Sequence, residues 1–298
     1  MKVSIQIPTY NQEKYISKAI KSALMQSYEN LEIVILDDGS SDHTFEIATS
    51  FASDKIKVFR NNENLGRAGT YRKLLYELTT GDWIANLDGD DYYTNKDFIT
   101  KGIEKLLTDK SLVFYQAAII GVSATHEYKF QHRLIKNDME GALEGKFYFK
   151  NFHRNEYFGH LATLYNAKKA RQIGFYTHSN LNADAESILK LALHGKVYLD
   201  NTIIGDWLIH ENNESKKSVL KNEETILSFE RLQTYSVPFI GFKDAEKWFS
   251  ETYNCNFRSY MGELAKLDFF SFLRLAISRG YVNFDLLKLI LKKLIGRI

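Results

Sequence analysis

Apolar residues recur with two different periods along the first 95 positions of the chain. Four short apolar runs predict strands at residues 3–7, 33–36, 56–59 and 83–87. Between the runs, apolar residues recur at the spacing of one helix face, within residues 16–24, 45–51 and 71–78. Strands that alternate with helices predict an α/β fold, in which helices flank a mostly parallel sheet.

Polar residues follow three of these four strands. They are residues 8–10 after the first strand, Asp37 and Asp38 after the second, and residues 88–91 after the fourth. Ligands of open parallel sheets bind beyond the carboxyl ends of the strands. The sequence therefore predicts a binding site where these three loops meet.

The most distinctive loop is the acidic one, residues 88–91. Side chains alternate along a strand, so Asp88 and Asp90 would point to the same side. Carboxylate oxygens suit Mg²⁺ or Mn²⁺, which can also hold phosphates. Asp and Gly are also common turn residues, so the loop by itself leaves an acidic turn open as an alternative.

The later part of the chain has a less regular pattern. It predicts a long strand at residues 111–122, a helix at residues 183–194 and helices from about residue 218 to the end. We therefore expect a domain boundary near residue 215, between an α/β domain at residues 1–215 and a helical C-terminal region at residues 216–298.

Composition narrows the class of protein. The chain has 298 residues, 44% of them hydrophobic and 26% charged, as in ordinary globular proteins. A net charge of +2 gives no general case for nucleic-acid binding. The single cysteine, Cys255, cannot form an intrachain disulfide. Without a signal peptide pattern or an apolar run of about 20 residues, we expect a cytoplasmic protein.

Several motifs, in this order, resemble those of the family 2 glycosyltransferases, which have the GT-A fold. The motifs lie at residues 7–11, 37–42, 64–66 and 81–91. The resemblance implies a Rossmann-like GT-A domain that binds a nucleotide sugar and a divalent metal, Mn²⁺ or Mg²⁺. Many members build bacterial surface polysaccharides, so a saccharide or lipid-linked saccharide acceptor is implied.

The resemblance also assigns residues to the nucleotide. The loop with Pro8, Thr9 and Tyr10 would pack on the base, and Asp38 would accept a hydrogen bond from a base N–H, which favours uracil or thymine. Arg72 would meet the base, ribose or diphosphate, although many members have Arg-Asn where this chain has Arg-Lys at residues 72–73. Arg67 is a lesser candidate for the same role.

The metal site follows from the same resemblance. Asp90 would ligate the metal, Asp88 would face the ribose or a metal-bound water, and Asp91 would support the site. His210 lies in a segment similar to the His-x-x-Asn-x-Ser of many relatives and could reach the metal or the diphosphate. A structural role is the alternative for His210, because lone histidines are often structural. His160 is a weaker candidate, which would line the site of the sugar acceptor.

The family places an acidic general base at the start of a helix about 90 residues beyond the metal motif. Asp184 occupies that place, and Glu186 is the second choice. Both are also acids that the first turn of any helix favours. The resemblance implies a single displacement with inversion at the sugar carbon.

Residues 284–295 have the pattern of a basic amphipathic helix, which suits an anionic membrane surface, a homodimer contact or simple packing. Two other functions remain open. A nucleotidyltransferase would carry a Gly-rich basic loop near the N-terminus, which residues 3–21 lack. A non-catalytic module would bind nucleotide sugars without turnover.

Overall fold

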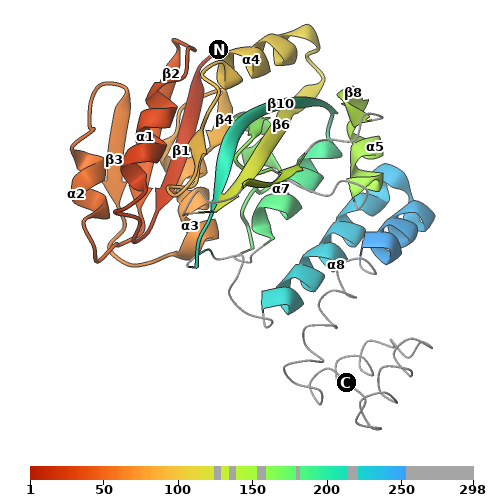
Figure 1. The fold of residues 1–298 in the computed structure, drawn as a ribbon. Coiled ribbons are helices and arrows are strands. Elements are labelled where there is room, and N and C mark those ends of the chain that lie inside the picture. The colour runs from red at the N-terminus through yellow and green to blue at the C-terminus, as the bar shows by residue number, and fades with distance from the viewer. Residues whose placement is uncertain are drawn as a thin grey trace, which may run out of the picture.

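One curved sheet passes through the computed structural model, which describes residues 1–123, 129–133, 139–152, 159–178, 182–211, 213 and 221–252 (Figure 1). Within that part of the chain, ten strands join in the order β3-β2-β1-β4-β9-β6-β10-β5, with β7 on β6 and β8 on β10. The strands are β1 (Val3–Thr9), β2 (Leu31–Asp37), β3 (Ile56–Arg60), β4 (Trp83–Asn86), β5 (Tyr92–Tyr93), β6 (Leu112–Ser123), β7 (Lys129–Arg133), β8 (Gly141–Glu144), β9 (Thr163–Asn166) and β10 (Lys196–Ile209).

The first four strands confirm the predicted parallel arrangement. β1 pairs in parallel with β2 and β4, and β2 pairs in parallel with β3. The second half of the sheet is mixed, because β9 runs antiparallel to both β4 and β6. β10 is parallel to β6 but antiparallel to β5 and β8. The sequence pattern did not predict β5, β8 and β9, of which β5 has only two residues.

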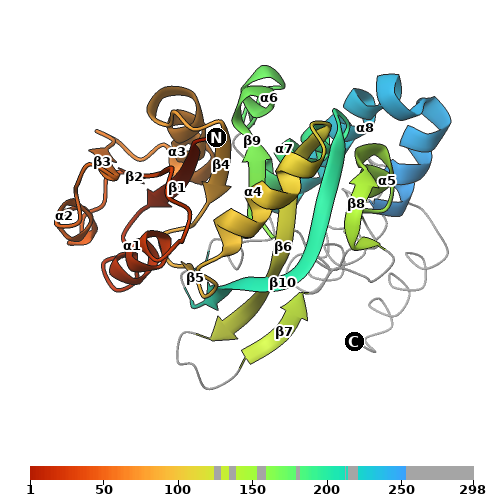
Figure 2. The same cartoon turned by 90° about the horizontal axis from the view of Figure 1, so that it is seen from above.

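Helices cover both faces of the sheet (Figure 2). They are α1 (Ile16–Leu24), α2 (Thr44–Thr49), α3 (Gly66–Lys73), the π-helical turn η1 (Leu74–Leu78), α4 (Phe98–Thr108), α5 (Gly145–Lys150), α6 (Ala167–Gln172), α7 (Ala183–Ala192) and α8 (Lys221–Ile240). In β2, Ile33 and Ile35 pack with α1, whereas Val34 and Leu36 pack with α3 and η1. Both strand faces are therefore buried, which explains the continuous apolar run.

The third predicted helix differs most from expectation. Apolar periodicity begins at Tyr71, but α3 already begins at Gly66 and changes to a π-helical turn at Leu74. Its first turn carries Arg67, Gly69 and Thr70, which hide the apolar period. The helix therefore starts close to the loop of residues 61–65, beside the predicted site.

The described C-terminal helices share the core of the α/β part. Phe229 and Leu232 of α8, and Trp248 beyond it, are buried in the same apolar cluster as α7. Among the described helices, none is long and apolar enough to cross a bilayer. The expected boundary near residue 215 and the amphipathic segment 284–295 lie outside the described residues, so both stay predictions.

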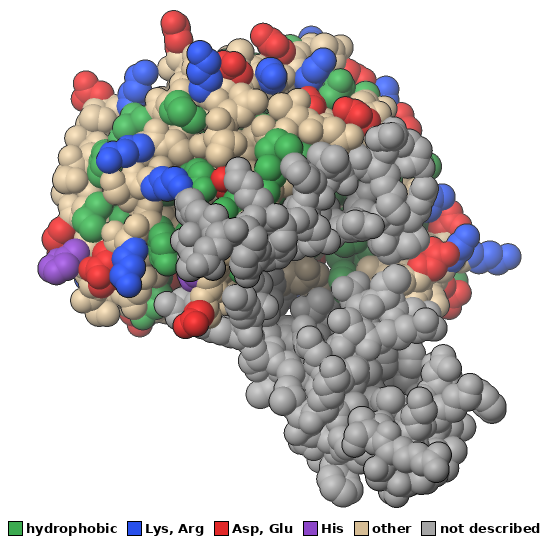
Figure 3. All heavy atoms as spheres, in the orientation of Figure 1, with side chains coloured by type: hydrophobic (Ala, Val, Ile, Leu, Met, Phe, Trp, Pro, Cys, Tyr) green, Lys and Arg blue, Asp and Glu red, His purple; other side chains and the backbone are tan. Residues whose placement is uncertain are grey.

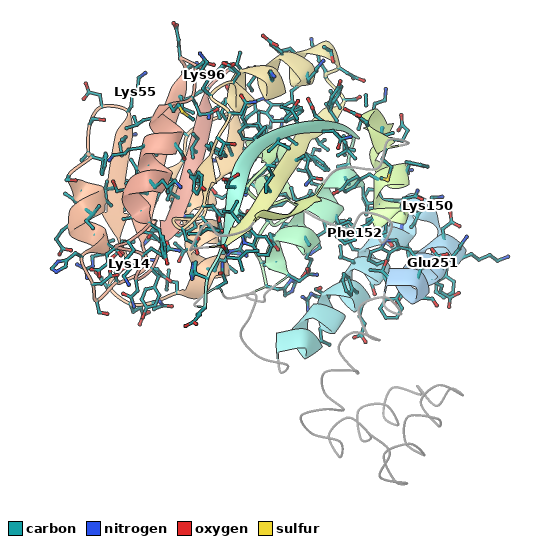
Figure 4. The ribbon with its side chains drawn as sticks, in the orientation of Figure 1. Lys14, Lys55, Lys96, Lys150, Phe152 and Glu251 are labelled. Carbon is teal, nitrogen blue, oxygen red and sulfur yellow. The ribbon has the colours of Figure 1, made fainter. Side chains whose placement is uncertain are left out.

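The two edges of the parallel strands can be followed in Figure 4. Lys14, which follows β1, lies at the edge formed by the carboxyl ends of the strands, and Lys55, just before β3, lies at the opposite edge. The predicted site therefore lies at the Lys14 edge. On the face drawn in Figure 3, the described Lys and Arg side chains are interspersed with Asp and Glu.

Candidate active site

The acidic loop packs directly against the loop that follows β1. The Gly89 amide donates to the Pro8 carbonyl at 3.2 Å, and the Asp91 amide donates to the Asp88 carbonyl at 2.9 Å. A Cβ at Gly89 would lie 2.3 Å from Oε1 of Gln12 and 2.9 Å from Oγ1 of Thr9. Glycine therefore allows the acidic loop to approach the predicted base-binding loop.

Asp88 lies at the centre of a hydrogen-bonded cluster. It accepts from the Tyr71 hydroxyl at 2.8 Å and from Nε and Nη2 of Arg67 at 3.4 and 3.3 Å. Burial alone would raise the pKa of Asp88, but Arg67 and these hydrogen bonds hold it below its ordinary value. The side chains of Asp88 and Arg67 remain 26% and 28% exposed, so a ligand can reach them.

Arg67 joins Asp88 to Asp184, which lies 117 residues away in the sequence. Its Nη2 lies 3.3 Å from Oδ2 of Asp184 and 3.1 Å from Nδ1 of His160. Oδ1 of Asp184 accepts from the Ala185 amide at 2.8 Å. Two donors thus orient Asp184 in the first turn of α7, beside the acidic loop, as the base prediction requires.

His160 is buried behind this cluster. Besides Arg67, it contacts the Asn86 side-chain amide and the Tyr176 hydroxyl through Nε2. Burial lowers the pKa of His160 to about 4, although Asp184 and Asp88 act in the opposite direction. The ring is therefore neutral at neutral pH, so one of its two nitrogens donates a hydrogen bond and the other accepts one.

Asp90 meets His210, which follows β10. Oδ2 of Asp90 and Nε2 of His210 are 2.9 Å apart, and the His210 ring stacks on Tyr15 with 5.0 Å between ring centroids. Within the described residues, no three His, Cys, Asp or Glu side chains surround a common point. One carboxylate and one imidazole nevertheless fit a divalent ion that takes its other ligands from water and a diphosphate.

Asp91 has a different environment from Asp90. Its side chain is buried and accepts from the Leu208 amide at 2.9 Å, so it fastens the acidic loop to β10. Burial, followed by the charges of Asp90 and Asp88, raises the pKa of Asp91 well above its ordinary value. Whether Asp91 supports the metal site or shares the ligation of the metal stays a prediction.

The predicted base-binding residues lie along the same edge. Thr9 is buried and donates to Oε1 of Gln12 at 2.8 Å, while Tyr10 is 47% exposed. Asp38 accepts from the Leu65 and Gly66 amides, at 2.9 Å each, and from Asn61 at 2.8 Å. Asp38 thus holds the loop before α3, and its bond to a nucleotide base stays a prediction.

Two predicted residues are not brought into the cluster. Arg72 is exposed and lies over the Tyr76 ring, at 5.2 Å from its centroid. Glu186 is buried and accepts from Arg231 and Lys190, which together lower its pKa despite the opposing effect of burial. Arg67 contacts Asp88 and Asp184, whereas the contact of Arg72 with the nucleotide stays a prediction, and Glu186 is paired with cations.

Four residues in contact with the predicted site were not named by sequence reasoning or were only lesser candidates: Tyr71, Tyr15, Arg67 and His160. Tyr71 looked like a core residue, because it lies on the apolar face of a helix. Tyr15 immediately precedes α1 and carries no motif. Only the position of Arg67 next to the Asn-Leu-Gly turn, residues 64–66, could have raised its rank.

Comparison with known proteins identifies the family to which this chain belongs. The family model described as glycosyl transferase family 2 matches residues 4–172, more than half of the chain. A UDP-Glc:alpha-D-GlcNAc-diphosphoundecaprenol beta-1,3-glucosyltransferase of Escherichia coli is 37% identical over 113 residues, which are 38% of this chain and 44% of that protein. The chain spans less than half the length of several curated relatives that it matches.

Two solved structures have a similar fold. TarS of S. aureus in complex with UDP gives a TM-score of 0.69 at 18% identity and covers 90% of this chain and 75% of that one. The mannosyltransferase PcManGT of Pyrobaculum calidifontis, in complex with GDP-Man and Mn²⁺, gives 0.59 at 13% identity, covering 94% and 80%. Together with the family model, these matches show that the chain belongs to glycosyl transferase family 2 and has the GT-A fold.

Proposed function

We propose that the protein transfers a sugar from a UDP-linked donor to a hydroxyl of a saccharide or lipid-linked saccharide, in surface polysaccharide or glycolipid synthesis. The observation that carries this proposal is the Arg67 bridge, which holds Asp88 and Asp184 on one guanidinium nitrogen. It brings a predicted donor-binding carboxylate and a predicted base together. The E. coli relative, named for a UDP-Glc donor, and the TarS complex with UDP support the choice of nucleotide.

The donor would lie along the loops after β1, β2 and β4. The exposed Tyr10 ring would stack on uracil, with Pro8 and Thr9 beneath it. Asp38 would set the edge of the base site, and Asp88 would accept from a ribose hydroxyl. These roles use side chains that the same edge of the sheet already brings together.

Asp90 and His210 would hold Mn²⁺ or Mg²⁺, since their side chains meet at 2.9 Å where a diphosphate would approach. When bound, such an ion neutralises the charge that gathers on the diphosphate leaving group. Asp91 keeps the loop in place through its bond to the Leu208 amide.

Asp184 is the proposed general base. The acceptor hydroxyl oxygen forms a bond to the anomeric carbon while the bond from that carbon to the UDP oxygen breaks. The hydroxyl proton passes to Asp184, and UDP leaves with the electron pair of the broken bond. A single displacement of this kind inverts the configuration at the sugar carbon.

The substitution Asp184→Asn tests the proposal. It keeps the size and the hydrogen bond to Arg67 but removes the base, so we expect transfer to fall by about 10³-fold. The thermal shift caused by UDP with Mn²⁺ should remain. Asp244→Asn, at an exposed position paired with Lys150, is the matched control and should keep full activity.

Three results would contradict the proposal. Full transfer by Asp184→Asn would remove the base assignment. No thermal shift with any nucleotide sugar would remove the donor site. Retention of configuration in the product, measured by NMR, would exclude the single displacement.

A further inference from the structure

Helix α8 contacts α7 at two residues that flank Asp184 in the sequence. Nδ2 of Asn182 donates to Oγ of Ser228 at 2.8 Å, just before the first turn of α7. Nη2 and Nε of Arg231 donate to the two oxygens of Glu186 at 2.7 and 3.1 Å. Both views of the ribbon show α8 beside α7 (Figures 1 and 2).

The Glu186 carboxylate is an unusual feature for a helix surface. Only 3% of the side chain is exposed, and Lys190 and His178 approach it at 2.8 and 3.2 Å in addition to Arg231. A buried carboxylate needs such partners, because its desolvation is costly. Of these partners, Arg231 alone comes from α8, and its planar fork binds both oxygens and so fixes their orientation.

The position of Glu186 on α7 gives the contact a geometric consequence. Residues two positions apart on a helix point about 200° away from each other. Glu186 therefore anchors the side of the first turn that lies opposite Asp184, which faces Arg67. A rotation of α7 that freed Glu186 from Arg231 would also move the Asp184 carboxylate away from the Arg67 guanidinium.

We propose that α8 is a positioning element for the catalytic base. Arg231 and Ser228 fix the first turn of α7, and this holds the Asp184 carboxylate on Arg67, beside the acidic loop. The inference rests on the proposed role of Asp184. Helix α8 would then affect kcat, through the position of Asp184, rather than the binding of the donor.

The substitution Arg231→Met tests this role in the full-length chain. Glu186 keeps Lys190 and His178 as partners, so we expect the protein to fold with a lowered melting temperature. A displaced base costs turnover, so kcat should fall by about 10- to 100-fold. KM for the nucleotide sugar should change by less than about two-fold, because Arg231 pairs with Glu186 of α7 and not with a residue of the predicted donor loops. Arg231→Lys should recover part of the loss.

A double substitution separates positioning from general stabilisation. If Arg231 acts through Asp184, adding Arg231→Met to Asp184→Asn should lower the residual rate by less than about two-fold. If Arg231→Met lowers the rate of the Asp184→Asn protein by as much as it lowers kcat of the unchanged protein, the proposal is overturned. So would an unchanged kcat in Arg231→Met alone, even where Asp184→Asn is inactive and the proposed function stands.

Two further variants complete the test. Arg171→Met is the matched control, since the guanidinium of Arg171 on α6 donates to the carbonyls of Leu75 and Thr79. It should lower the melting temperature and leave kcat unchanged. If Arg231→Met fails to fold, Ser228→Ala provides the milder change, with an expected two- to five-fold loss of kcat. Unchanged kcat in a folded Ser228→Ala would then contradict the proposal.

Discussion

Two regions of the site are assembled in different ways. The donor edge consists of the loops after β1, β2 and β4, and parallel pairing of neighbouring strands sets their relative positions. The base side consists of α7 and the side chains that fix it, and contacts between distant segments hold it. The bond from Arg67 to Asp184 spans 117 residues, and the bond from Arg231 to Glu186 spans 45.

The difference explains why motifs predict the donor loops, whereas on the base side the family pattern predicts Asp184 but not the side chains that fix it. Each donor loop follows its own strand, so local sequence determines both the loop and its place in the sheet. Residues of the base side share no local pattern, because their neighbours come from other elements. Substitutions within each region, and at the Arg67 bridge between them, therefore test this comparison.

The largest effect should follow from Asp90→Ala. Asp90 belongs to the donor edge, and its partner His210 comes from the end of β10. We expect the transfer rate to fall by at least about 10³-fold, because charge on the leaving group is no longer neutralised. Titration with Mn²⁺ in the presence of UDP should show weakened binding. Asp54→Ala, an exposed acidic position, should behave as the unchanged protein.

Arg67→Lys tests the bridge between the two regions. A lysine ammonium cannot reproduce the planar fork that reaches two carboxylates and His160, so we expect kcat to fall by about 10- to 100-fold. Arg72→Lys provides the comparison with the sequence-based prediction. A large loss for Arg72→Lys and none for Arg67→Lys would restore Arg72 to the site and contradict the geometry.

His160 gives the base side a pH-dependent stability. Its pKa of about 4 in the folded state lies below the ordinary value of 6.5, so the unfolded chain binds more protons between these values. The contribution of the neutral His160 ring to the free energy of unfolding is therefore complete above pH 6.5, and it is lost as the pH falls toward 4.

From about pH 7.5 to about pH 5, this titration should remove about 2 kcal/mol of unfolding free energy. His160→Gln should lose that part of the pH dependence, although its stability at pH 7.5 will be lower. Urea unfolding of both proteins at the two pH values measures the difference. Equal pH dependence in both would show that His160 is not the titrating group.

The smallest effect should come from Gly66→Ala, within the donor edge. Gly66 has φ +73° and nothing within 4 Å of an added Cβ, so the cost is backbone strain of about 1 kcal/mol. Its amide donates to Asp38, so UDP affinity should also fall, by about three-fold. Gly141→Ala, at φ +100° and also in open space, should lose similar stability without a change in UDP affinity.

The sequence was sufficient for the parallel half of the fold, because short apolar segments mark β1 to β4 and helices separate them. It was also sufficient for the family, through the motifs at the donor edge. It did not distinguish Arg67 from Arg72, because α3 lacks an apolar period that would show which face is inward. The pairing of Glu186 with Arg231 depends on how α8 packs, which no local pattern encodes.

The long separation between paired strands also bears on how the chain folds. The strands β1 to β4 pair with one another within the first 86 residues. In contrast, β10 pairs with β6 and also with β5, and β5 lies more than 100 residues before its partner in β10. Distant pairings form slowly, and a chain under synthesis emerges from its N-terminus. A growing chain can therefore order its donor loops early, but Asp90 meets His210 only after β10 has docked. Catalytic competence should thus be among the last properties that a newly made molecule acquires.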